Sequence, residues 1–142
     1  MKTPVLFLLP VVFFSLRATG NAQDVHNGLW WNGISPAAKQ MVVTGFLDGM
    51  ALGHNLSLMG AGNSSDADCR TKIAESYTYV RGRYFKSVAP REIASALDDL
   101  YSESDNGSII FGRAVWIAVK RLGGTSKDDI QKLILQSRGV DY

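Results

Sequence analysis

Apolar residues recur with helical spacing along the chain from about residue 35 onward. The first predicted helix begins after Ser35, a good N-cap residue, and Pro36 suits its first position. Its apolar face consists of Val42, Val43, Phe46, Leu47 and Met50. Residues 57–68 follow as a predicted loop, because glycine, serine, asparagine and aspartate dominate them.

Two further helices are predicted in the middle of the chain. The second has its apolar face at Ile73, Tyr77, Val80 and Tyr84, and Gly82 weakens its end. The third begins near Pro90 and carries charged residues opposite its apolar face. That apolar face consists of Ile93, Ala94, Ala96, Leu97, Leu100 and Tyr101. A turn follows at residues 103–108.

The last two helices differ in character. Residues 114–122 are apolar nearly all round apart from Lys120 and Arg121. Their valine and isoleucine content would suit a strand, but their length, their alanines and the following glycine pair favour a buried helix. The final helix opens with a capping box of Ser126 and Asp129 and presents Ile130, Leu133 and Ile134. The pattern therefore predicts a single compact all-α domain of about five helices.

Three glycines four residues apart, Gly45, Gly49 and Gly53, form a stripe beside the first apolar face. Each costs a helix interior about 1 kcal/mol relative to alanine. We expect the stripe to let another helix approach closely, with the helix around Trp116 as the first candidate. The alternative is that the glycines contact a ligand or a partner chain. Asp48 borders the same face, and we expect it to be a buried structural anchor rather than a ligand-binding carboxylate.

The N-terminal segment has the three regions of a secretory signal peptide over residues 1–22. Lys2 provides the positive charge, thirteen largely apolar residues follow, and Gly20 and Ala22 are the small residues before cleavage. A membrane anchor would need about 20 apolar residues. We therefore expect an exported protein, periplasmic or extracellular, whose helical domain comprises residues 23–142.

The net charge and the cysteine content of the chain limit the kinds of partner and covalent bond that we expect. Without Lys2 and Arg17 the chain has thirteen basic and thirteen acidic residues, so nothing in its charge favours nucleic acid or an anionic membrane. Cys69 is the single cysteine, which excludes an intramolecular disulfide. It lies in a polar stretch, and an intermolecular bridge or a redox role is the alternative to an unimportant thiol.

Catalytic and metal-binding signatures are weak. His26 and His54 are the only histidines, and neither has a second ligand at metal spacing, so we expect no metal or other cofactor. No nucleophile motif is present. The enzymatic alternative is a small hydrolase with a site around Asp48 and His54. The basic and aromatic residues 81–86 could suit a nucleic-acid or phosphate surface, but in a secreted neutral chain such a run more often ends a helix.

Three motifs carry a resemblance to known proteins: TGFLDGM at residues 44–50, LDDLYSESDNGSI at 97–109 and AVWIAV at 114–119. They resemble motifs of small secreted bacterial helical proteins of no established function. More distantly, the size, the signal peptide and the glycine-rich helix are similar to immunity proteins that neutralise type VI secretion amidase effectors. Those proteins usually carry paired cysteines, whereas this chain has one.

The sequence therefore predicts a non-enzymatic protein that binds an unidentified protein partner through a helical surface, as the immunity proteins do. The candidate binding residues are Asp48, Tyr84, Tyr101 and Asn106.

Overall fold

The computed structural model describes residues 26–61 and 67–138, which form helices and no strand. The helices are α1 (Gly28–Gly33), α2 (Pro36–Ala61), α3 (Ala67–Val80), η1 (Arg81–Phe85), α4 (Pro90–Tyr101), η2 (Ser104–Asn106), α5 (Phe111–Leu122) and α6 (Lys127–Ser137). Of these, η1 is a π-helical turn and η2 a 3₁₀ turn. The predicted all-α fold is confirmed. The predicted signal peptide lies outside the described residues.

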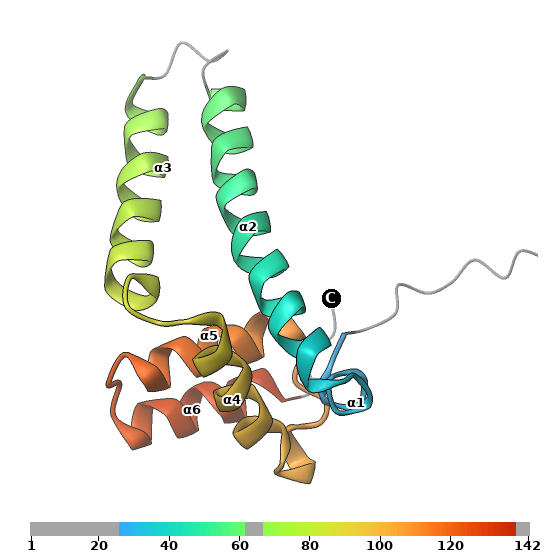
Figure 1. Ribbon diagram of the computed structural model, residues 1–142. Coiled ribbons are helices and arrows are strands. Elements are labelled where there is room, and N and C mark those ends of the chain that lie inside the picture. Colours follow the sequence, from blue (N-terminus) through green and yellow to red (C-terminus); the bar gives the residue numbers. More distant parts are fainter. Residues whose placement is uncertain (1–25, 62–66, 139–142) are drawn as a thin grey trace, which may run out of the picture.

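The core lies between α4, α5, α6 and the N-terminal part of the chain (Figure 1). Helix α5 is buried along most of its length, as its apolar sequence predicts, and packs between α4 and α6. Ser126 caps α6, since its Oγ accepts a hydrogen bond from the Asp129 backbone N–H at 3.2 Å. These three helices form a base on which the remaining elements rest.

Trp31 anchors the N-terminal turn α1 to this base. Its side chain is fully buried, and its Nε1 donates a hydrogen bond to Asp98 Oδ1 of α4 at 2.8 Å. Lys39 of α2 forms an ion pair with the same oxygen at 2.6 Å and lies over the Trp31 ring. One carboxylate therefore joins α1, α2 and α4. This role was not predicted, because Asp98 stands on the charged side of its helix.

Helices α2 and α3 form a hairpin that extends away from the base (Figure 1). Helix α3 has no buried residue, so the outer part of the hairpin has little core of its own. At its base end α3 continues into η1, which returns the chain toward α5.

Several element boundaries differ from the sequence prediction; α5, for example, begins at Phe111 rather than at residue 114. Residues 57–61 continue α2 and residues 67–68 begin α3, so the loop predicted over residues 57–68 is too long. The short helix α1 was not predicted. Asn27 is its N-cap residue, and the Asn27 Oδ1 accepts hydrogen bonds from the backbone N–H groups of Leu29 and Trp30. A helix of six residues is too short for apolar residues to recur at helical spacing, so only the N-cap residue Asn27 indicates it in the sequence.

Candidate binding surface

The outer face of α2 exposes large apolar side chains along much of the helix. We use this name for the face formed by Met41, Leu52, Leu56 and Met59. Their side chains are 75%, 59%, 56% and 69% exposed, respectively. Because an α-helix turns about 100° per residue, these four positions fall within an arc of about 60°. The opposite side of α2 packs on α3 and α4, so the helix is apolar on two sides.

The glycine stripe lies beside the outer face and is open to solvent. A Cβ atom built on Gly45, Gly49 or Gly53 meets no atom of the described residues within 4 Å. The expected close packing of another helix against these glycines is therefore wrong for this part of the chain. The physical reason is that α2 turns Val43 and its neighbours inward, while the expected partner, α5, is packed between α4 and α6.

Close packing at a glycine occurs elsewhere, at Gly28 in α1. A Cβ there would lie 2.6 Å from Tyr101 Cδ1 and 2.9 Å from Gly107 Cα. The backbone N–H of Gly28 also donates to the Gly107 carbonyl oxygen at 3.1 Å. The stripe in α2 thus remains without an internal explanation in the described structure.

Asp48 lies on α2 next to the outer face, and its side chain is exposed. Among the described residues it takes part in no hydrogen bond or ion pair, so the prediction of a buried anchor is wrong. The pattern was misread because Asp48 borders apolar residues that themselves face outward.

His54 lies on the other side of α2, where its ring stacks on Tyr77 of α3. The ring centroids are 3.8 Å apart and the planes nearly parallel, at 5°. Asp48 does not line the groove that contains His54. The structure therefore does not bring together the two residues on which the hydrolase alternative depends.

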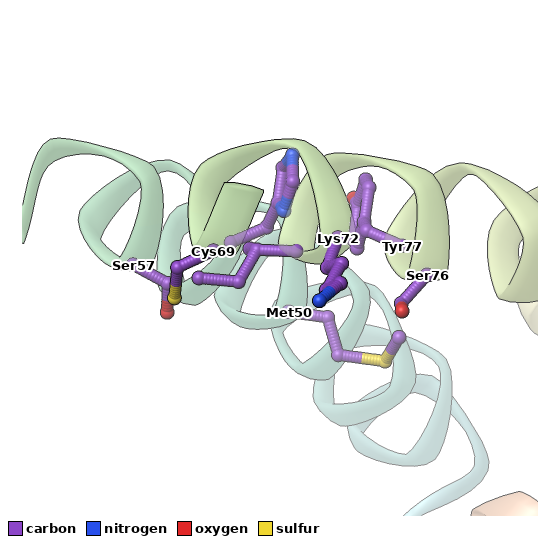
Figure 2. Close-up of a pocket in the computed structure, with 8 residues that line it drawn as sticks. Met50, Ser57, Cys69, Lys72, Ser76 and Tyr77 are labelled. Carbon is purple, nitrogen blue, oxygen red and sulfur yellow. The ribbon is translucent and has the colours of Figure 1, made fainter. Parts of the chain in front are cut away.

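An open groove of about 650 Å³ lies between α2 and α3. Figure 2 shows side chains from both helices along it, with Met50 and Ser57 from α2 and Cys69, Lys72 and Tyr77 from α3. Cys69 is exposed and not in a disulfide. Within the described ranges no group of three histidine, cysteine, aspartate or glutamate side chains could hold a metal ion. The groove is a shallow, largely apolar surface.

Tyr101 and Asn106 belong to the core and are not retained as candidate binding residues. Tyr101 is 3% exposed, and its hydroxyl donates to the Ile109 carbonyl oxygen at 2.9 Å. Asn106 is fully buried; its Nδ2 donates to the Leu100 carbonyl oxygen at 2.8 Å, and its Oδ1 accepts two hydrogen bonds from the Arg138 guanidinium. Both side chains therefore stabilise the segment that connects α4 to α5, through buried hydrogen bonds to backbone carbonyl oxygens.

Tyr84, in η1, is half-buried beside α5. Its hydroxyl accepts a hydrogen bond from Lys120 Nζ at 3.0 Å, and its ring lies edge-on to Trp116. The hydrogen bond from Lys120 lowers the pKa of Tyr84. Of the four candidate binding residues, Asp48 and Tyr84 remain accessible.

None of the described helices combines the length and apolarity needed to cross a membrane. The sequence matches no protein-family model, and neither a curated protein nor a solved structure was found to be similar to it.

Proposed function

We propose that this protein is an exported, non-enzymatic binding protein that receives a helix of a partner protein on the outer face of α2. The single observation that carries the proposal is the exposure of Met41, Leu52, Leu56 and Met59 beside a row of open glycines. Exposed apolar side chains gathered along one face of a helix mark interaction sites in folded proteins. The resemblance to immunity proteins supports the same class, since those proteins act by binding.

The glycines support a helix as the occupant. Each one costs α2 about 1 kcal/mol relative to alanine, and no internal contact in the described chain requires their small size. A partner helix crossing at the stripe would use that space, because its backbone could approach without meeting Cβ atoms. An amphipathic helix laid along an apolar surface is a common mode of recognition.

Charge further specifies the partner. Asp48 is the one charged residue among positions 41–60. A carboxylate at the edge of an apolar interface needs a hydrogen-bond donor or a cation on the partner when it loses water. We therefore expect the partner helix to present apolar and small residues, with a lysine, an arginine or a polar donor facing Asp48.

The test is affinity capture with two matched double variants. Leu52→Asn with Leu56→Asn alters the outer face, whereas Leu122→Asn with Leu135→Asn alters exposed leucines of the base. The proposal expects the same partner protein to be captured by the wild type and by the base variant, and to be lost from the outer-face variant. Equal loss from both variants, or equal retention, contradicts it.

A further inference from the structure

A second cluster of side chains lies where η1 meets the end of α5, at the opposite end of α3 from the hairpin tip. The sequence of η1, the residue after it and the end of α5 together carry five basic residues, Arg81, Arg83, Lys86, Lys120 and Arg121, of which Arg83 and Lys120 act on Tyr84. The salt bridges among the described residues involve none of the five. The cations at the end of α5 complement the partial negative charge of that helix terminus, and Arg83 in the last turn of η1 does the same for the end of the α3–η1 helix.

Lys120 is held in a defined position within this cluster. Its Nζ donates to the Tyr84 hydroxyl oxygen at 3.0 Å and lies 4.6 Å from the centre of the Tyr84 ring and 5.0 Å from that of Trp116. Two aromatic rings and one hydrogen bond therefore fix the ammonium group before any ligand arrives. A fixed cation binds an anion without paying the entropy of ordering a mobile side chain.

The donors of the cluster remain available. An ammonium group has three N–H donors, and Tyr84 uses only one of those on Lys120. The Tyr84 oxygen accepts that bond, so its own O–H proton can be donated outward. The hydrogen bond from Lys120 and the charges of Lys120 and Arg83 lower the pKa of Tyr84, which indicates a positive local potential. Hydrogen bonds from Ser126 and Lys132 lower the pKa of Asp129, and the charge of Lys120 adds a smaller effect in the same direction.

We propose that Arg83, Tyr84 and Lys120 form a binding site for a phosphate group. Three separate donor groups suit a tetrahedral oxyanion, which offers acceptors in several directions, better than a planar carboxylate. The site is separate from the outer face of α2 and does not depend on the function proposed for that face. The phosphate group comes from a free phosphate or from an anionic lipid headgroup, and the experiment distinguishes the two.

The first arm is a titration of the ¹⁵N-labelled protein with inorganic phosphate, followed by NMR against potassium chloride of equal ionic strength. The proposal expects saturable shifts at the Trp116 indole N–H and at the Lys120 amide. It also expects Tyr84→Phe and Lys120→Gln each to weaken binding about tenfold or more, the cost of one charge-assisted hydrogen bond. Arg70→Gln, an exposed cation at the start of α3, is the control and leaves the affinity unchanged.

The second arm is co-sedimentation with phosphatidylglycerol vesicles, with phosphatidylcholine vesicles as the control. Sedimentation that Tyr84→Phe abolishes supports the site with a lipid headgroup as its ligand; saturable shifts without sedimentation support it with free phosphate. Tyr84→Phe keeps the ring and its contact with Trp116, so the test survives even if Lys120→Gln does not fold. Shifts that match those in chloride, or that persist in Tyr84→Phe, together with no variant-sensitive sedimentation, overturn the proposal.

Discussion

The Tyr101 side chain lies in an apolar environment, where its hydroxyl group needs a hydrogen-bond partner. Its ring is buried near Trp31, and its hydroxyl is bonded to the Ile109 carbonyl oxygen. Burial raises the pKa of this hydroxyl well above its ordinary value. The side chain therefore couples the stability of the core to pH.

We expect Tyr101→Phe to lower the free energy of unfolding by about 1 kcal/mol at neutral pH, because the Ile109 carbonyl loses its donor. The wild type should also lose stability as the pH rises above 10, where Tyr101 ionises in the unfolded chain but stays protonated in the folded one. The variant should lack that part of the alkaline loss. Urea unfolding of both proteins at pH 8 and pH 11 measures the two effects, and parallel pH dependences would contradict the assignment.

Gly28 is the glycine whose small size the fold requires. In Gly28→Ala the new Cβ would lie 2.6 Å from Tyr101 Cδ1 and 2.9 Å from the Gly107 backbone, which leaves no room without movement. We expect a loss of about 1–3 kcal/mol by thermal or urea unfolding. Gly33→Ala, where a Cβ meets nothing within 4 Å, is the control and should change stability by less than about 0.5 kcal/mol. Equal effects at the two positions would show that α1 is not packed as described.

At the scale of single helices, α2 has an apolar side that packs inward and another that faces solvent. The glycines on its outer side lower its intrinsic helix propensity and, in the described structure, gain no contact in return. This makes α2 less stable in isolation than an otherwise identical helix with alanines at those positions.

We therefore expect Gly49→Ala to raise the free energy of unfolding by about 0.5–1 kcal/mol, the difference in helix propensity between the two residues. Gly49→Leu should likewise fold without an overpacking penalty, yet prevent a partner helix from approaching the stripe. Chemical unfolding and partner capture of both variants check this pair of outcomes. A loss of more than about 1 kcal/mol in Gly49→Leu would indicate an internal contact at the stripe.

Asp48→Ala should change the free energy of unfolding by less than about 0.5 kcal/mol, because the carboxylate is exposed and bonded to none of the described residues. If the carboxylate faces a donor on the partner, the same change should weaken binding. A loss of about 1–3 kcal/mol in urea unfolding would instead restore a structural role for Asp48.

The sequence was sufficient to predict the buried side of those helices whose charged and apolar sides are distinct. In α4 the apolar positions from Ile93 to Tyr101 are buried as predicted, and the Ser126 cap of α6 is present. In α2 the predicted apolar face does pack inward, since Val43 is buried and Val42, Phe46 and Leu47 lie against the core. The pattern could not tell how far around the helix this packing extends, so Asp48 and the glycine stripe were misplaced. A hydropathy period defines a face, but only the tertiary contacts determine whether another element covers it.

The sequence alone could not predict the roles of side chains whose partners lie far away along the chain. Asn106 is satisfied by Arg138, 32 residues later, and Lys120 lies 36 residues from Tyr84. In both pairs the two residues are too far apart in the sequence to be brought together by a single helix or turn. Asp98 joins Trp31 and Lys39 in the same way, although its neighbours in the sequence indicate only a charged surface.

At the scale of the whole molecule, a well-packed base supports a hairpin with little core of its own (Figure 1). The base supplies the stability, and the hairpin presents the outer face of α2. Exposed apolar side chains and glycines with open space beside them are found together on this one helix. The central claim is that another protein covers that face.

Site-specific photo-crosslinking tests this claim most directly. A photoreactive residue is placed at Leu52 in one protein and, as a control, at Leu135 on α6 in another, and each is irradiated in cells that express the protein. The account predicts one defined crosslinked protein from position 52, absent from position 135 and lost when Gly49→Leu is added; a product of twice the chain mass would identify a second copy as the partner. No crosslink at position 52, or the same products from both positions, would contradict it.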